Sequence, residues 1–447
     1  MDMVIPQNLH ALAEACSFPL YIVGGYVRDF LAGLKSGKQD IDICAPVAAE
    51  KFVAVAESCG AYVNAVYANT GTVKLCFGAE EYEFACFRSD EYVRGVHAPV
   101  KTFFTDDIYA DARRRDFKCN AVYYDIKRGE LCDPLGGIED IKNKVIATVA
   151  LPDKVFGEDG LRLMRLARQA AQTGFSPSAD CLAGAKNNAR LAADVSAERI
   201  YAELAAILQA DLRYGVKDAQ YRGLEILKST GVLNVILPEL TLGDGMAQNE
   251  KFHRYDVLEH SLRAVKYAEP CVRLAALVHD IGKPCCMREN GNYHMHEKEG
   301  ARIALAALSR LKVPKKAAAE AAELTALHMY DMRCDARENK IRKFMVKNYA
   351  VLDKLLLLKQ ADYSACRDDT STAPCVEKWR GIYGKMVEDG VPFTLKDMKV
   401  RGGEIIAAGA VPSSVGGILE KLLYDCAVGA VKNEREALLK RCRIYIG

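Results

Sequence analysis

The feature that most constrains the fold is a diglycine at the end of a β-like run. The apolar run at residues 20–25 predicts a strand that ends in Gly24 and Gly25, and residues 26–33 predict a helix. Glycines at a strand end let the backbone approach a bulky anion, since no Cβ intervenes. A helix that begins there directs its free N–H groups and the positive end of its dipole at the same anion. The pattern therefore favours a phosphate site.

Two alternating aspartates follow on the next predicted strand. Asp40 and Asp42 occupy positions i and i+2 of the run 40–45, so their carboxylates share one face of that strand. Such oxygen ligands suit Mg²⁺, which can bridge a triphosphate and an attacking hydroxyl. Alone, each motif is an ordinary turn or strand end, but in this order they favour a catalytic site. A third acidic ligand is expected on a neighbouring strand, where Glu83 in the run 82–87 is the candidate; an exposed strand glutamate is the alternative.

The hydrophobic periodicity divides the chain into an α/β head and a long helical remainder. A β-like run at 72–77 and a helical run at 47–58 complete the head, and from about residue 154 the pattern is helical. Pro and Gly at 238–245 predict a linker, and the periodicity breaks again at 368–374. These boundaries predict four domains, at 1–150, 151–245, 246–370 and 371–447.

The composition disfavours membrane and secreted proteins. No stretch of the 447 residues approaches the roughly 18 consecutive apolar residues of a membrane span, and the N-terminus lacks the pattern of a signal peptide. The sixteen cysteines contain no Cys-x-x-Cys pair, which predicts a reducing cytoplasm rather than a disulfide or zinc scaffold. Because 61 basic residues face 59 acidic ones, a nucleic-acid binder of this composition needs local basic patches.

A cluster of arginines follows the predicted strands of the head. Adjacent arginines such as Arg114 and Arg115 repel each other unless something anionic lies between them, and guanidinium groups match phosphate oxygens. Asp116, next in the chain, could accept a hydrogen bond from a ribose hydroxyl, which would favour ribonucleotides.

The segment Glu158-Asp159-Gly160-Leu161-Arg162 is expected to open a helix. Acids in a first turn are ordinary helix design. A second interpretation is base recognition, because cytosine and adenine both present an amine beside an acceptor nitrogen. A carboxylate from Asp159 and a guanidinium from Arg162, one helical turn apart, could read that edge and reject guanine and uracil.

With these motifs in order, the chain resembles the class II CCA-adding enzymes and bacterial poly(A) polymerases, which have a polymerase-β-type nucleotidyltransferase head. The resemblance covers about residues 20–245 and also rests on the segments 133–140 and 196–204. It implies an α/β head with a mixed, five-stranded type of sheet, a helical neck that reads the base, and Mg²⁺ bound by Asp40 and Asp42 beside Glu83. It further implies that the nucleotide is held by Gly24, Gly25, Arg28, Arg114, Arg115, Asp116, Asn120, Glu158, Asp159, Arg162, Arg165 and Arg168.

One loop departs from the family pattern. The family carries a Tyr-x-Asp-x-Arg-like run after the strand motif, whereas residues 92–99 lack the acid. That loop is thought to control the switch from C to A addition. The departure therefore bears on the order of nucleotides rather than on transfer itself.

Six of the eight histidines lie between residues 253 and 328. Neutral imidazoles with a carboxylate make a transition-metal site, whereas a lone histidine in an apolar helix is more often a core residue. The order of histidines and aspartates resembles the HD phosphohydrolase superfamily, which implies His260, His279, Asp280 and Asp362 as ligands of a divalent transition metal. His296 and His328 would add to them or support a second metal, with His294 as the weaker alternative to His296.

The metal could generate a hydroxide that attacks a phosphoester, such as a 2′,3′-cyclic phosphate or a terminal phosphate on damaged RNA. The alternative is a vestigial domain that only packs. The helical tail resembles that of HD-containing CCA-adding enzymes, which grips the tRNA elbow, and residues 390–447 carry nine basic against six acidic residues.

These observations predict a template-independent tRNA nucleotidyltransferase that adds C, C and A from CTP and ATP, with an attached HD hydrolase. A poly(A) polymerase is disfavoured because it should need a strongly basic extension to hold arbitrary RNA. An enzyme that adds only CC or only A stays open, as does an HD phosphohydrolase with a non-catalytic head. The predicted partners are the tRNA 3′ end and elbow, CTP and ATP, with no membrane; the oligomeric state is left open.

Overall fold

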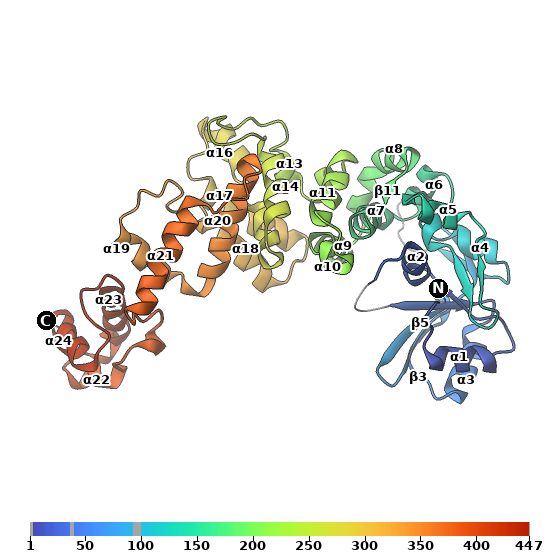
Figure 1. Cartoon of the computed structure of the whole chain (residues 1–447), viewed down its shortest axis with the longest axis horizontal. Coiled ribbons are helices and arrows are strands. Elements are labelled where there is room, and N and C mark those ends of the chain that lie inside the picture. The colour runs from blue at the N-terminus through green and yellow to red at the C-terminus, as the bar shows by residue number, and fades with distance from the viewer. Residues whose placement is uncertain (1–2, 36–39, 93–99, 447) are drawn as a thin grey trace. The chain divides into compact units, whose positions relative to one another are not determined.

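The computed structural model describes residues 3–35, 40–92 and 100–446 (Figure 1). The chain forms two compact units. Unit 1 comprises Met1–Thr241 with Arg310–Lys312, and unit 2 comprises Leu242–Ser309 with Val313–Gly447. The division falls within the predicted linker at 238–245, although its first residues form a short helix, α13 (Pro238–Thr241). The four finer domain boundaries stay predictions.

Unit 1 contains a mixed sheet, as predicted, but with seven strands rather than five, in the order β3-β4-β5-β2-β1-β8-β9. The strands are β1 (Tyr21–Val23), β2 (Ile41–Ala45), β3 (Tyr62–Tyr67), β4 (Thr72–Phe77), β5 (Glu80–Cys86), β8 (Tyr123–Asp125) and β9 (Glu130–Cys132). Strands β2 and β5 run parallel, and the other neighbours are antiparallel. The sequence signal missed β3, β8 and β9 because β3 is mostly exposed and the other two have three residues each.

Short helices cover this sheet. Helix α2 (Gly25–Ala32) packs on β1 and β2, and α3 (Ala49–Ser58) packs on β3 and β4 and against α1 (Gln7–Ala15). A separate hairpin of β6 (Arg88–Glu91) and β7 (Lys101–Phe104) precedes α4 (Ile108–Arg113). One buried cluster of the hydrophobic core includes Val23, Cys44, Phe87, Ala121 and Tyr123.

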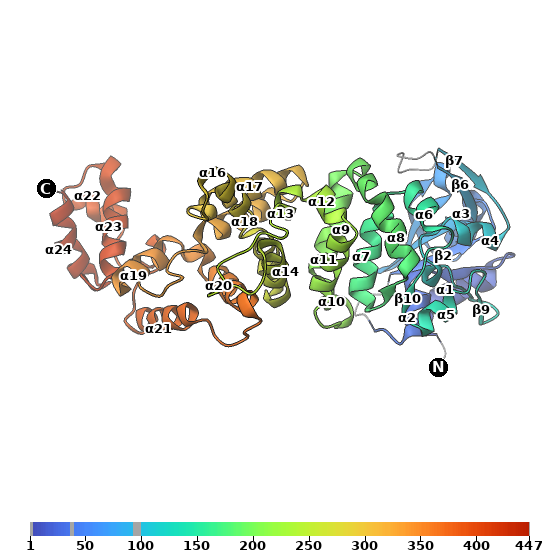
Figure 2. The same cartoon turned by 90° about the horizontal axis from the view of Figure 1, so that it is seen from above.

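The rest of unit 1 is helical, apart from the two-residue strands β10 (Val145–Ile146) and β11 (Ser176–Pro177). Its helices are α5 (Gly137–Lys142), α6 (Pro152–Glu158), α7 (Leu161–Thr173), α8 (Ala179–Asn188), α9 (Ala197–Leu208), α10 (Asp211–Tyr214), α11 (Ala219–Ser229) and α12 (Val232–Ile236). Helix α7 packs against α6, α9 and α11 (Figures 1 and 2), so nearly all of its side chains are buried, including those of several polar residues.

The described part of unit 2 consists of helices and turns. Its longer helices are α14 (Val257–Tyr267), α15 (Arg273–Val278), α16 (Lys283–Asn290), α17 (His296–Arg310), α18 (Lys315–Leu327), α19 (Glu338–Lys347), α20 (Leu352–Arg367), α21 (Pro374–Glu388), α22 (Gly402–Ala407), α23 (Val415–Ala427) and α24 (Arg435–Ile446). The break predicted at 368–374 separates α20 from α21. Among the helices of the described ranges, none combines the length and apolarity needed to cross a bilayer.

Gly137 provides a test of how α5 packs against the turn at Lys118. A Cβ at this buried position would stand 2.1 Å from the backbone oxygen of Lys118, in the turn that leads to Asn120. We expect Gly137→Ala to lower the free energy of unfolding of unit 1 by about 1–3 kcal/mol, as overpacked core substitutions do. The control Gly157→Ala, in open space on α6, should leave it unchanged or raise it by up to about 1 kcal/mol.

Denaturant unfolding can assign the change to a unit. Trp379, the single tryptophan of the chain, lies in unit 2, so its fluorescence follows that unit. The effect of Gly137→Ala should appear in the circular dichroism signal and not in tryptophan fluorescence. Equal unfolding free energies for the two alanine variants would show that the backbone at Lys118 can shift without lowering stability.

Candidate functional site

The end of β1 lies against the carboxylate of Asp42. Gly24, the residue before α2, has a φ of +83°, a conformation that favours glycine. A Cβ at Gly24 would stand 3.1 Å from Oδ2 of Asp42. The backbone can approach this carboxylate only because the side chain is absent.

The three predicted carboxylates lie at one place on the sheet. Asp42 of β2 is the register partner of Glu83 on the parallel strand β5, and Asp40 lies two residues before Asp42. The expectation that Glu83 stands on a neighbouring strand is confirmed. Its carboxylate is about half exposed and lies 4.0 Å from the ammonium of Lys74, while Asp40 lies 3.9 Å from Arg213.

The electrostatics of these three carboxylates disfavours their negative charges unless a cation lies beside them. The side chain of Asp42 reaches solvent, but the surrounding protein displaces much of its water, which raises its pKa to about 6. Repulsion from Glu83 and Asp40 adds to the shift, and Arg115 opposes it. A divalent cation would relieve that repulsion, so the donor set fits the predicted Mg²⁺.

The anion between the adjacent arginines proves to be a protein carboxylate, which the sequence reasoning missed. Asp111, fully buried on α4, accepts a hydrogen bond from Nε of Arg114 at 2.7 Å and from Nη2 of Arg115 at 2.9 Å. Tyr123 donates its hydroxyl to the same carboxylate at 2.7 Å. Burial alone would raise the pKa of Asp111, but the two arginines outweigh it and lower the pKa to about 2. The available signal was its spacing, three and four residues before the arginines on a helix.

Asp116 is occupied by protein donors. Its Oδ1 accepts from the N–H of Phe117 at 2.8 Å and from the amide of Asn120 at 3.0 Å, and its Oδ2 accepts from Nε of Arg165 at 2.7 Å. Burial opposes ionisation, but Arg165 and Asn120 hold the pKa well below its usual range. A ribose hydroxyl would therefore have to compete with these donors.

Arg28 is also engaged by protein. Its buried guanidinium donates to Asp29 at 2.6 Å, to Asn120 at 2.8 Å and to Gln169 of α7 at 3.4 Å. The network joins α2 to the turn at Asn120 and to α7. The nucleotide contacts of Arg28 and Asn120 stay predictions, since the structure places both in this internal network.

The residues predicted to read the base do not open one helix as expected. Helix α6 ends at Glu158, Asp159 is extended with φ −146°, and α7 begins at Leu161, whose N–H donates to Oδ1 of Asp159 at 3.0 Å. Arg162 bonds to Glu158 at 2.7 Å and lies 5.5 Å from the ring of Tyr92. Asp159 and Arg162 thus come from two elements that meet at a break.

The remaining predicted site residues of the head are two arginines of α7 and the switch loop at 92–99. Arg165 bonds Asp116, as described, and Arg168 donates to Glu203 of α9 at 2.5 Å. Only Tyr92 of the predicted switch loop at 92–99 belongs to the described residues, so the departure at 93–99 lies outside them.

In unit 2 the structure brings together the six side chains predicted as transition-metal ligands. They are His260 on α14, His279 and Asp280 after α15, His296 at the start of α17, His328 after α18, and Asp362 on α20, and all are buried. Nε2 of His260 lies 3.0 Å from Asp362 Oδ1, and Nε2 of His296 lies 3.2 Å from Asp280 Oδ1. His294 is exposed, so His296 is the histidine that reaches this HD centre.

Backbone contacts orient three of these histidines. Nδ1 of His279, His296 and His328 donates to the carbonyl three residues earlier, at 2.7–2.8 Å. Each ring therefore turns Nε2 toward the centre, as metal-binding histidines require. Nε2 of His296 and Nε2 of His328 lie 3.2 Å and 3.7 Å from buried Asp280 Oδ1, yet none of these three atoms makes a hydrogen bond within the described chain, which fits a metal between them.

The charges at the centre also fit a cation. Burial would raise the pKa of Asp280, but His279 and Lys283 hold that pKa well below its usual range. Burial would lower the pKa of His279, but Asp280 and Asp362 outweigh it and raise the pKa to about 10. The same carboxylates would stabilise a metal cation at this place.

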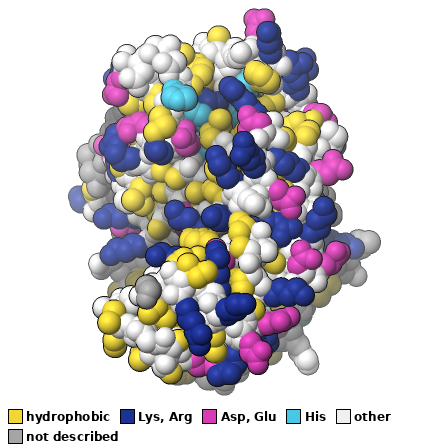
Figure 3. Space-filling model, turned by 90° about the vertical axis from the view of Figure 1, so that its left-hand side faces the viewer, with side chains coloured by type: hydrophobic (Ala, Val, Ile, Leu, Met, Phe, Trp, Pro, Cys, Tyr) yellow, Lys and Arg dark blue, Asp and Glu magenta, His cyan; other side chains and the backbone are white. Residues whose placement is uncertain are grey.

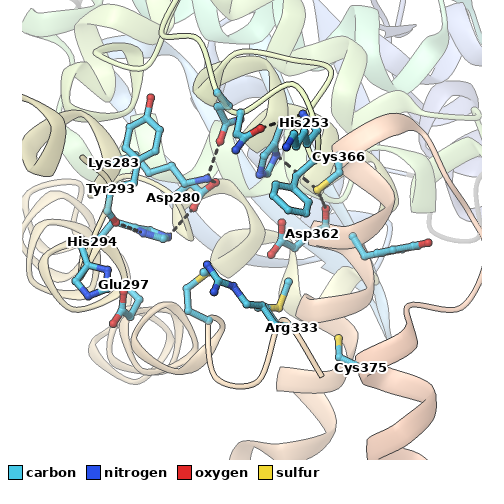
Figure 4. A pocket seen from close by; sticks show the side chains of 18 of the residues that line it. His253, Asp280, Lys283, Tyr293, His294, Glu297, Arg333, Asp362, Cys366 and Cys375 are labelled. Atoms are coloured by element: carbon cyan, nitrogen blue, oxygen red, sulfur yellow. Dashed lines mark hydrogen bonds and ion pairs between the residues drawn. The ribbon is translucent and has the colours of Figure 1, made fainter. Parts of the chain in front are cut away.

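The HD centre opens into a pocket of about 1450 Å³ (Figure 4). Lys283 lines it and donates from Nζ to Asp280 at 2.6 Å and to Gln248 at 2.7 Å. Arg333 and Arg367 add positive charge to the walls. The pocket is large enough for the phosphorylated end of a nucleotide, and its basic side chains stand beside the acidic Glu297 and Asp369.

Three family models match the chain. The Poly A polymerase head domain matches residues 20–147, the probable RNA and SrmB-binding site of polymerase A matches 174–242, and the HD domain matches 257–364. The matches place the two sites described above in the head and in the HD domain.

Two solved structures share the fold along nearly the whole chain. The CCA-adding enzyme of Bacillus stearothermophilus in complex with CTP has a TM-score of 0.68 and 24% identity, covering 99% of this chain and 98% of that one. The Thermotoga maritima CCA-adding enzyme complexed with tRNA has a TM-score of 0.63 and 16% identity, covering 100% and 97%. The expected fold class is confirmed.

Curated relatives carry the same architecture. A CCA-adding enzyme of Geobacillus stearothermophilus is 33% identical over 234 residues, 52% of this chain and 53% of that one. An A-adding tRNA nucleotidyltransferase of Deinococcus radiodurans is 30% identical over 445 residues, 93% of each chain. Because this second match runs along nearly the whole length of both proteins, the chain belongs to the family of tRNA nucleotidyltransferases that contains the A-adding and CCA-adding enzymes.

Proposed function

We propose that this chain adds C, C and A to the 3′ end of tRNA, without a template, from CTP and ATP. The observation that carries the proposal is the close approach of Gly24 to Asp42, with Glu83 in register beside it, in a chain of this family. A phosphate bound at the start of α2 would lie next to these carboxylates. The two solved structures with this fold are complexes with CTP and with tRNA, which supports the choice of substrates.

In this mechanism the 3′-hydroxyl of tRNA attacks the α-phosphate of the nucleotide in line, and pyrophosphate leaves. Asp40 and Asp42, with Glu83, would hold Mg²⁺, which activates the hydroxyl and neutralises charge on the leaving oxygens. Arg114 and Arg115, which Asp111 holds in place, would contact the phosphates.

Addition of A alone is the second candidate. The Deinococcus radiodurans relative, which matches along 93% of each chain, is an A-adding enzyme. The pair Asp159 and Arg162 would accept either cytosine or adenine, so it does not decide between the two activities.

For unit 2 we propose a metal-dependent phosphohydrolase. His260, His279, Asp280 and Asp362, with His296 and His328, would hold a divalent transition metal, as the unpartnered buried atoms of this group favour. The bound metal would supply a hydroxide for attack on a phosphoester. Lys283, Arg333 and Arg367 in the pocket support a terminal or 2′,3′-cyclic phosphate of RNA as substrate.

The tail is proposed to bind the tRNA elbow. Exposed basic side chains are Lys396, Lys399, Arg401, Lys421, Lys432, Arg435, Lys440 and Arg443. Figure 3, which has the C-terminal end of the chain toward the viewer, shows many Lys and Arg side chains with fewer acidic ones among them. This distribution suits phosphate contacts that position RNA without reading its sequence.

The decisive test uses purified protein, Mg²⁺ and a tRNA that ends at the discriminator base or at CC. Each substrate receives CTP, ATP or both, and products are resolved at single-nucleotide length. We expect two additions to the shorter tRNA with CTP and three with both nucleotides.

Other product patterns would replace this proposal. Addition of A to the CC-ending tRNA with no addition of C would make the protein an A-adding enzyme. A stop after two additions of C, with ATP present, would make it a CC-adding enzyme. Long A ladders on unrelated RNA would make it a poly(A) polymerase, and no addition at all would leave the HD centre as the working site.

The two centres should be separable by substitution. Asp42→Ala is expected to reduce transfer to background and to leave phosphohydrolysis of an RNA 2′,3′-cyclic phosphate intact, because it removes a ligand of the head alone. Asp280→Ala is expected to do the reverse. Transfer retained by the first variant would refute the metal assignment at Asp42, and circular dichroism checks that both variants fold.

Asp111 should act as a positioning residue for the nucleotide phosphates. Asp111→Asn keeps the shape but removes the charge that holds Arg114 and Arg115, and hydrogen bonds to charged groups contribute about 1.5–3 kcal/mol. We expect KM to rise by about tenfold or more for both CTP and ATP, with a smaller change in kcat.

A matched control lies on the same helix. Asp107 caps α4 by accepting from the N–H of Tyr109 at 2.8 Å, and asparagine serves equally well as a cap. Asp107→Asn should therefore leave KM unchanged. A purely structural role for Asp111 would show as a fall in Tm with KM unaltered.

A further inference from the structure

His260 differs from the other histidines of the HD centre. The rings of His279, His296 and His328 each have Nδ1 bonded to a backbone carbonyl. Nδ1 of His260 is buried and has no hydrogen-bond partner within the described chain, while its Nε2 faces Asp362 at 3.0 Å. One nitrogen of a fully buried imidazole is thus left for another ligand.

Two further donors lie beside this ring. The ring of His253 stands perpendicular to that of His260, with centroids 4.9 Å apart. Sγ of Cys366 lies 3.6 Å from Nδ1 of His253. Cys366 follows Asp362 by one turn of α20, so both side chains lie on the same face of that helix, as Figure 4 shows.

The three donors are close enough to share one ion. Three ligand atoms, one each from His253, His260 and Cys366, lie within 4.8 Å of one another. His253 and Cys366 also line the pocket, which leaves an open side for water or substrate. A buried cysteine often serves only as a small hydrophobic side chain. Cys366, however, is only partly buried and contacts an imidazole.

We propose that His253, His260 and Cys366 form a second metal position beside the HD centre. A thiolate and two imidazoles suit a borderline-soft divalent ion such as Zn²⁺ or Co²⁺, with a fourth position open to the pocket. His260 bridges the two ions, through Nε2 to the HD centre and through Nδ1 to the second position. Binding releases two protons to solvent, one from the thiol of Cys366 and one from the ring of His260.

The second ion would add positive charge to the pocket beside the HD centre. Because the two nitrogens of one imidazole diverge, the two ions would lie farther apart than the roughly 3.5–4 Å of ions that clamp one phosphoester together, so the second ion would bind a neighbouring group of the substrate. This inference rests on the proposed HD metal only through the shared His260, so the two can fail separately.

Cobalt provides the test, because a thiolate bound to Co²⁺ gives a charge-transfer absorption that imidazole and carboxylate ligands lack. The full-length protein is stripped of metal and titrated with Co²⁺, and the cobalt bound per chain is measured with the spectrum. We expect the charge-transfer absorption in the wild type and its loss in Cys366→Ser, with one equivalent of cobalt fewer per chain. His253→Asn should lose the same equivalent.

Cys334 offers a matched control, because it lines the same pocket but is not grouped with these histidines. Cys334→Ser should keep both the absorption and the cobalt content. An absorption that persists in Cys366→Ser would overturn the assignment. Phosphohydrolysis with bound cobalt but no thiolate absorption would overturn this second position and leave the HD proposal standing, and no cobalt at unit 2 would overturn both.

Discussion

The head depends on the close approach of two strands at the point where one of them ends. Strand β1 pairs with β2 so that Val23 faces Asp42, and the chain then turns through Gly24 with a positive φ directly over that carboxylate. A side chain at Gly24 would displace either the turn or the carboxylate. Strand β5 continues the register and sets Glu83 beside Asp42. Backbone pairing therefore determines where the acidic groups meet, before any metal or nucleotide is present.

Buried charge pairs join this sheet to the helices that follow. Asp111 and Asp116 lie in the interior, and each is held ionised by arginines, two from its own segment for Asp111 and Arg165 of α7 for Asp116. Removing one partner of such a pair leaves an uncompensated charge in a medium that solvates it poorly. The pair of Asp116 and Arg165 thus fixes α7 against the turn at Asn120, and with it the position of Arg162 at the break after α6.

The sequence predicted the parts of the fold and site that depend on local pattern. The strands of Asp42 and Glu83 and the helix after the diglycine follow from short motifs and periodicity, and they lie as expected. The six residues of the HD centre follow from the resemblance to the HD superfamily, and the structure brings them together. What the sequence missed depends on tertiary contacts. Strand β3 is mostly exposed and gives little alternation, and α7 begins at Leu161 rather than at Glu158, because Asp159 is extended. Asp111 was missed because a single acid before three arginines gains its meaning only when burial brings the guanidinium groups around it.

The same distinction between motif and environment explains why the two centres differ in character. In the head the carboxylates reach solvent, and the pKa of Asp42 is raised first by partial loss of water and then by nearby charges of the same sign. In unit 2 the residues of the HD centre are buried, and backbone carbonyls orient three of the histidines, while several buried ring nitrogens have no hydrogen-bond partner in the described chain. An open cluster of hard oxygen donors favours an ion that retains water and exchanges with a nucleotide. A buried set of oriented imidazoles would favour an ion that stays bound. The two sets of residues would therefore support two kinds of metal chemistry.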